Sequence, residues 1–201
     1  MHTFFPKTPP LKTYKTKAKS LKNLENISSL LPKLLLTNKV QSTINSMNKN
    51  SFSVDVLLKN KNIKEINLAM VHLSFIAHSY IWGGDKPQKI LPEVISKPWV
   101  KLSKFLGRPP ILSYASYCLD NWFKIDNDQP ISLDNVALIN NFLGGVDEDW
   151  FVTIHVCIED AASEAVRSTI ALVEETSESD IEIHLKNILC SLEKVNSIFK
   201  R

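Results

Sequence analysis

Two tyrosines and a cysteine in the middle of the chain have a spacing suited to lining a pocket. Tyr114, Tyr117 and Cys118 lie within GRPPILSYASYCLDNW, which opens with a double proline. Because proline is favoured in the first turn of a helix, we predict a helix over residues 111–123. The three side chains then share one face of that helix. Two phenols and a thiol suit a ligand pocket, although spacing alone favours the simpler interpretation that they pack in the core.

A histidine later in the chain lies on a mainly apolar helical stripe. Phe151, His155, Ile158 and Ala162 recur at helical spacing in WFVTIHVCIEDAAS. The small residues that follow would let another element approach closely, and an imidazole beside them suits a cavity. Spacing alone nevertheless favours a structural role for His155.

A strongly apolar helix is expected to form the centre of the fold. The sequence IKEINLAMVHLSFIAHSYIW is apolar on nearly all sides, follows an Asn62-x-x-Glu65 capping box and ends at a double glycine. We therefore predict a buried helix packed on more than one side. Its two histidines, His72 and His78, are interpreted as hydrogen-bonded core residues rather than as ligands.

Helical periodicity and capping signals place the remaining elements around this helix. For residues 131–145 the sequence leaves two alternatives, a helix or a strand. The predicted helical segments are residues 21–46 with a break at Pro32, a short helix at 98–105, a long helix after the acidic residues 147–149, and an amphipathic helix from 181. The last of these reaches Arg201 without a stop signal, so we expect further sequence to follow.

Length and composition favour an ordinary globular protein. The chain has 201 residues, 44% hydrophobic and 22% charged. We predict no membrane span, because no apolar run is long enough, and a cytoplasmic location, because the basic N-terminus lacks a signal peptide. Cys118, Cys157 and Cys190 are far apart and odd in number, which fits neither a disulfide framework nor a zinc site.

The net charge of +3 hides an asymmetry along the chain. Up to Lys64 there are twelve Lys against only Glu25 and Asp55, whereas the remainder is acidic overall. A basic leading segment can bind nucleic acid. Here the positive residues are all Lys, without Arg and without repeated aromatics, so a solvated, partly flexible arm is the better interpretation and no nucleic-acid partner is predicted.

Three segments together carry a resemblance to a known family. HLSFIAHSYIWGG, ILPEVISKPWVKLSKFLGRPPILSYASYCLDNW and DEDWFVTIHVCIEDAAS are similar, in order and spacing, to the N-terminal half of the indoleamine 2,3-dioxygenase family. The double-proline segment ending in Asn-Trp and the later Ile-Glu-x-Ala-Ala motif are specific in combination. The resemblance extends from about Leu21 to Arg201.

The resemblance implies an all-α fold, with a small N-terminal helical domain above a larger helical domain and haem b between them. On that basis residues 1–20 are a flexible basic lead-in, residues 21–145 the small domain and residues 146–201 the start of the large one. The implied reaction inserts both atoms of O2 across the indole C2–C3 bond of tryptophan and gives N-formylkynurenine.

The resemblance also implies roles for four residues in a distal pocket. Tyr114 matches a distal tyrosine, and Phe151 matches an aromatic residue that flanks the indole. Tyr117 stands at a substrate-lining position often held by a smaller residue and would narrow the pocket. His155 falls close to the bound oxygen and the indole N–H, as the implied catalytic residue.

Other parts of the family pattern lie beyond this chain. These are the proximal histidine that ligates the iron, a Gly/Ser-rich loop and an arginine for the substrate carboxylate. We therefore expect no metal ligand in the chain, an inactive isolated chain, and a separate C-terminal half as partner. The alternative is a non-enzymatic helical binding module derived from such an enzyme.

Overall fold

The fold of the computed structural model is built almost entirely from helices, which confirms the all-α expectation. It describes residues 5–6, 8–174 and 177–200. Within these residues the only sheet is a two-stranded antiparallel ribbon that pairs Trp122 with Leu138. The elements are α1 (Lys19–Leu36), α2 (Val40–Asn45), α3 (Asp55–Asn60), α4 (Ile63–Trp82), α5 (Glu93–Leu106), the π-helix η1 (Ala115–Leu119), β1 (Trp122–Lys124), β2 (Val136–Leu138), α6 (Val146–Glu174) and α7 (Glu178–Phe199).

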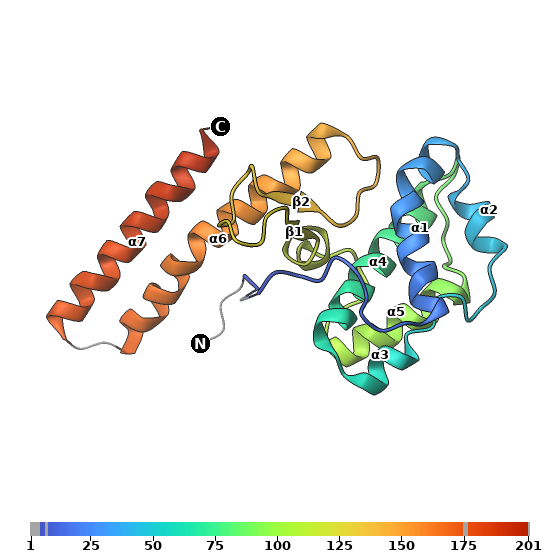
Figure 1. Ribbon diagram of the computed structural model, residues 1–201, viewed down its shortest axis with the longest axis horizontal. Coiled ribbons are helices and arrows are strands. Elements are labelled where there is room, and N and C mark those ends of the chain that lie inside the picture. The colour runs from blue at the N-terminus through green and yellow to red at the C-terminus, as the bar shows by residue number, and fades with distance from the viewer. Residues whose placement is uncertain (1–4, 7, 175–176, 201) are drawn as a thin grey trace.

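The helices form two groups joined by η1 and the β-ribbon (Figure 1). α1 to α5 surround α4, whose residues are buried on most of its circumference, as the sequence predicts. α6 and α7 form a long helical hairpin at the other end of the molecule. None of the helices in the described ranges is both long and apolar enough to cross a membrane.

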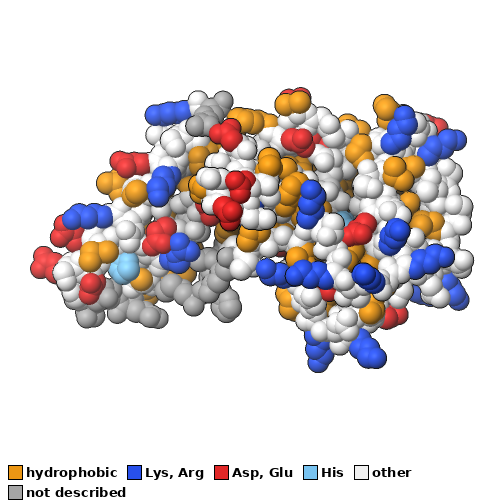
Figure 2. Space-filling view, in the orientation of Figure 1, with side chains coloured by type: hydrophobic (Ala, Val, Ile, Leu, Met, Phe, Trp, Pro, Cys, Tyr) orange, Lys and Arg blue, Asp and Glu red, His pale blue; other side chains and the backbone are white. Residues whose placement is uncertain are grey.

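Lysines do not gather into a basic groove on the face seen in Figure 2. There the blue side chains are scattered over the α1–α5 group, with acidic and apolar side chains between them. This arrangement agrees with a solvated basic surface.

Two prolines lie inside helices, and for both of them the sequence-based prediction is wrong. The second helix was expected to begin at residue 98. α1 continues through Pro32 to Leu36, although we expected a break there, and α5 begins at Glu93 with Pro98 in its interior. Each proline removes one backbone hydrogen bond. In α1 the burial of Leu24, Leu31 and neighbouring apolar side chains against α4 outweighs that loss.

The segment around Tyr114 is less regular than predicted. Instead of a helix over residues 111–123, the chain forms turns and then the single π-turn of η1, in which the Asp120 N–H donates to the Ala115 carbonyl at 2.8 Å. Trp122 then enters β1 fully buried, and its Nε1–H donates to the Leu119 carbonyl at 2.9 Å. In a regular helix the Trp122 side chain would not occupy this buried position. The burial of Trp122 therefore ends the helix early. Residues 131–145, for which both helix and strand were considered, contain the short strand β2.

The irregular residues 8–18, the N-terminal strap, are fastened to α4 by the buried carboxylate of Glu65. This carboxylate accepts hydrogen bonds from the Lys15 and Thr16 N–H groups at 2.7 Å each, from Thr16 Oγ1 at 2.9 Å and from Asn62 Nδ2 at 3.0 Å. Asn62 thus donates to Glu65 rather than capping the helix. Burial raises the pKa of Glu65, but these donors outweigh it and hold the pKa below its ordinary value.

The strap also buries His72, which is a core histidine as predicted. Tyr14 Oη and His72 Nδ1 are hydrogen-bonded at 2.9 Å. Burial lowers the pKa of His72 to about 3, so the imidazole is neutral at physiological pH. Beyond the strap, Phe5 stacks on Trp122 with ring centroids 5.5 Å apart, so the N-terminal segment contacts both α4 and the β-ribbon.

Glu65→Gln is expected to lower the free energy of unfolding by about 2–3 kcal/mol, because several donors lose a charged acceptor. The folded-state pKa of Glu65 lies below its ordinary 4.5, so its contribution is present above that pH and is lost as pH falls through the folded-state pKa. Thermal melting at pH 7 and pH 3 measures both effects. Glu93→Gln, in an exposed i,i+4 pair with Lys97, is the control and should not change the melting temperature. An equal loss in both variants would contradict the role of Glu65.

Candidate functional site

Four aromatic side chains from η1 and α6 meet at the junction of the two helical groups. Phe151 and His155 have ring centroids 4.3 Å apart, Tyr114 meets His155 edge-on at 6.0 Å, and Tyr117 lies 6.0 Å from Phe151. We call Tyr114, Tyr117, Phe151 and His155 the aromatic wall. The structure therefore brings together all four residues singled out in the sequence, while their roles remain a prediction.

Two further phenylalanines support this wall from behind. Phe75 of α4 stacks on Tyr117 at 5.7 Å and on Phe142 at 4.6 Å, and Phe142 lies 6.2 Å from Tyr117. Phe75 is fully buried. Sequence reasoning missed both residues, because Phe75 is one of many apolar residues in α4 and Phe142 lies in a segment without a clear period. Together they fix the Tyr117 ring against the core.

The imidazole of His155 has a defined orientation. Its Nδ1 lies 2.6 Å from the Phe151 carbonyl oxygen, which can only accept, so Nδ1–H is the donor. In the neutral ring this leaves Nε2 as a hydrogen-bond acceptor. The backbone of α6 thereby selects the tautomer.

The other titratable groups of the site are kept protonated by burial and by nearby carboxylates. Burial, with a hydrogen bond to Glu159 next in importance, raises the pKa of Tyr114, and burial followed by Glu148 raises that of Tyr117. Burial and then Glu159 raise the pKa of the Cys118 thiol to about 12. At physiological pH the two phenols and the thiol are therefore uncharged.

The aromatic wall is open on one side. Phe151 is 49% exposed and Tyr114 is 38% exposed, and Val146 and Trp150 are also exposed at the start of α6. A cavity of about 650 Å³ lies elsewhere on α6, where α7 and residues 131–134 meet it, and none of the four wall residues lines it. The wall is thus an open surface rather than the lining of an enclosed cavity.

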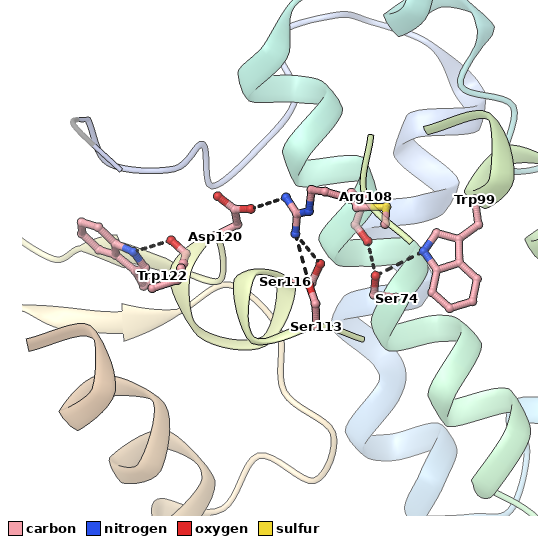
Figure 3. A network of polar contacts seen from close by, with 9 residues as sticks. Ser74, Trp99, Arg108, Ser113, Ser116, Asp120 and Trp122 are labelled. Atoms are coloured by element: carbon pink, nitrogen blue, oxygen red, sulfur yellow. Dashed lines mark hydrogen bonds and ion pairs between the residues drawn. The ribbon is translucent and has the colours of Figure 1, made fainter. Parts of the chain in front are cut away.

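A polar network around Arg108 fixes η1 and so the two tyrosines (Figure 3). One guanidinium nitrogen donates to Asp120 at 2.9 Å, and the other donates to Ser116 at 3.0 Å. Arg108 directly follows Gly107, the left-handed residue that ends α5. Burial raises the pKa of Asp120, although the guanidinium opposes this shift. The network ties the end of α5 to both ends of η1.

Metal-binding side chains do not cluster at this site. Across the residues that the structure describes, there is no group of three or more His, Cys, Asp or Glu side chains able to hold a metal ion. What the wall offers is four rings and, in the neutral form of His155, one oriented acceptor at Nε2. Such a surface suits a flat, largely apolar ligand with few hydrogen-bonding groups.

Fold and site together define an all-α protein with an aromatic wall between its two helical groups. The model of the indoleamine 2,3-dioxygenase family matches residues 1–201, and the chain belongs to this family. This confirms the resemblance found in the sequence.

Individual relatives show the same similarity. The chain is 38% identical over 139 residues to Indoleamine 2,3-dioxygenase 1 of Mus musculus, covering 67% of this chain and 34% of that protein. It is 32% identical over 163 residues to Indoleamine 2,3-dioxygenase of Saccharomyces cerevisiae (78% and 35%) and 33% identical over 153 residues to Indoleamine 2,3-dioxygenase 2 of Homo sapiens (75% and 36%). The matches span about a third of the length of these relatives.

Arg108→Ala should destabilise the fold by about 2–3 kcal/mol, because it leaves the half-buried Asp120 carboxylate without its cation. The side chains of this pair are 23% and 13% exposed. Arg167→Ala, which breaks the more exposed pair with Glu164, is the matched control and should cost no more than about 1 kcal/mol. Urea denaturation measures both, and an equal loss would argue against a special role for the network.

The three cysteines should differ strongly in reactivity. Cys190 is exposed, whereas Cys118 and Cys157 are buried, and the thiolate is the reactive form. At neutral pH a thiol reagent should modify Cys190 at least about a hundredfold faster than Cys118. Labelling time courses of the wild-type chain and of Cys190→Ser test this expectation. A fast phase that persists in Cys190→Ser would refute it.

Proposed function

We propose that the chain forms the distal side of a haem pocket in a dioxygenase that inserts both atoms of O2 across the C2–C3 bond of an indole. The observation that carries the proposal is the aromatic wall itself, a one-sided surface of four rings on which His155 Nδ1 is held by the Phe151 carbonyl. Membership of the indoleamine 2,3-dioxygenase family supplies the reaction class, and tryptophan is the proposed substrate.

The residues present fit the distal side of haem b. Exposed ring faces on Phe151 and Tyr114 can pack against a flat apolar group, and no charged side chain belongs to the wall. His72 and His78 lie within the α1–α5 group, each hydrogen-bonded there, so neither serves as an axial ligand. We assign the axial ligand and the opposite side of the pocket to sequence outside these residues.

When bound, the haem supplies activation of O2, while the chain orients the substrate and excludes water. Phe151 packs against the indole ring, and Tyr117, held by Phe75 and Phe142, limits the space beside it. His155 Nε2 accepts the indole N–H and so fixes which edge of the ring faces the oxygen. An indole bound here without that acceptor would bury an unpaired N–H. His155 therefore acts in catalysis by holding this proton in place.

We further propose that the isolated chain does not turn over and that it acts in the cytoplasm with a C-terminal half. The division at residues 20 and 145 into a lead-in, a small domain and the start of a large domain belongs to the same proposal. One observation favours the alternative, a non-enzymatic helical binding module. The aromatic wall is already assembled by this chain alone, so a ligand could bind without chemistry.

Haemin titration distinguishes these possibilities. The 201-residue chain alone is expected to give no saturable Soret change, and addition of the C-terminal two-thirds of the mouse relative should give a haem complex that oxidises tryptophan. Phe151→Ala and His155→Ala should each lower kcat/KM of that complex by about tenfold or more, through lost contact and an unpaired indole N–H.

Phe199→Ala, an exposed aromatic near the end of α7, is the control and should leave kcat/KM unchanged. A stoichiometric Soret change with the chain alone would contradict the assignment of the axial ligand. Tight binding of tryptophan to the chain would favour the binding module if haem binds neither to the chain alone nor to the complex.

A further inference from the structure

A carboxylate one turn beyond His155 holds the outer tyrosine of the aromatic wall. Tyr114 Oη donates a hydrogen bond to Glu159 Oε1 at 2.8 Å. Glu159 lies four residues after His155 on α6, so the two side chains project from neighbouring turns of the same helix face. The link joins η1 to α6 at the edge of the wall.

The contact decides where the phenol of Tyr114 points. The Tyr114 ring lies against His155 with centroids 6.0 Å apart and planes at 72°. Because the two rings are in edge-on contact, rotation of a Tyr114 side chain that has lost Glu159 can carry its hydroxyl toward the imidazole. His155 Nδ1 already donates to the Phe151 carbonyl, so Nε2 is the nitrogen to which a released Tyr114 hydroxyl would donate.

An ionised carboxylate is well suited to prevent this competition. It only accepts hydrogen bonds, and a charged acceptor binds a phenol more strongly than a neutral imidazole does. After burial, Glu159 also raises the pKa of Tyr114, first through its hydrogen bond and then through its charge, and raises the pKa of Cys118 through its charge. The carboxylate is therefore close enough to the wall to determine the orientation of the Tyr114 hydroxyl.

We propose that Glu159 is a positioning residue, which binds the Tyr114 hydroxyl and thereby keeps His155 Nε2 free to accept the N–H of an indole. The inference rests on the proposed function, because it assigns the freed acceptor to the substrate. It goes beyond that function in naming the residue that keeps the acceptor available.

The first test follows the hydroxyl itself in the 201-residue chain. Tyrosinate absorbance is titrated with alkali, and the Tyr114 component is isolated by subtracting Tyr114→Phe. The titratable groups facing this hydroxyl are Glu159, Cys118 and His155. Tyr114 should ionise at the highest pH in the wild type, at a lower pH in Glu159→Gln, which keeps an acceptor without charge, and at the lowest in Glu159→Ala.

Asp160→Asn is the matched control, because it removes the neighbouring carboxylate of α6, and it should leave the Tyr114 titration unchanged. Circular dichroism of each variant confirms that the helices remain folded. Identical Tyr114 titrations in the wild type, Glu159→Gln and Glu159→Ala would overturn the proposal.

The second test follows the imidazole. In Glu159→Ala the released phenol should donate to His155 Nε2, which shifts the ¹⁵N resonance of that nitrogen toward its hydrogen-bonded value. Adding Tyr114→Phe to Glu159→Ala should restore the wild-type resonance. A shift that persists in the double variant would mean that Glu159 acts on the helix rather than through the tyrosine, and would overturn the proposal.

The third test measures function in the complex with the C-terminal part of the mouse relative. Glu159→Ala should raise KM for tryptophan by about tenfold, with a smaller effect on kcat, and Tyr114→Phe in the same chain should recover most of the loss. A merely structural role predicts no recovery. Failure of the proposed function is seen separately, as a complex in which Phe151→Ala changes neither kcat nor KM.

Discussion

The ion pair between Arg108 and Asp120 is the interaction on which the functional part of the structure depends. It joins the end of α5 to the residue that follows η1, with the Ser116 hydroxyl as a further acceptor. η1 is a single π-turn, which has too few hydrogen bonds of its own to be stable without tertiary contacts. Both tyrosines of the aromatic wall lie at this turn, so their positions follow from a buried charge pair outside the wall.

The wall combines this rigid support with an absence of charge. Phe75 and Phe142 press on Tyr117 from the core, and the backbone of α6 orients His155 through the Phe151 carbonyl. Negative charge is present nearby, but its effect is to keep the phenols protonated. A surface of this kind discriminates by shape and by one hydrogen bond, which suits a substrate whose reactive part is a flat ring.

Local periodicity predicted the long helices, whereas the grouping of the four wall residues was implied by the resemblance to the family. The buried helix around His72 and the helical spacing of Phe151 and His155 could both be predicted from this periodicity. The π-turn was not, since it arises from the burial of Trp122 and from the Arg108 network, which join positions that are not neighbours on any regular helix. The same holds for Glu65 and Glu159. Each sits at an ordinary helical position, and its partner is 45 or more residues away.

The N-terminal strap has a consequence for the order in which the chain folds. Its residues leave the ribosome before their acceptor, Glu65, which is made some 50 residues later, and Phe5 can stack on Trp122 only when that residue has been made. Such distant contacts close slowly, because the chain between them must be ordered first. The strap is therefore expected to be among the last parts to order, after α4 and the strand that holds Trp122 have formed.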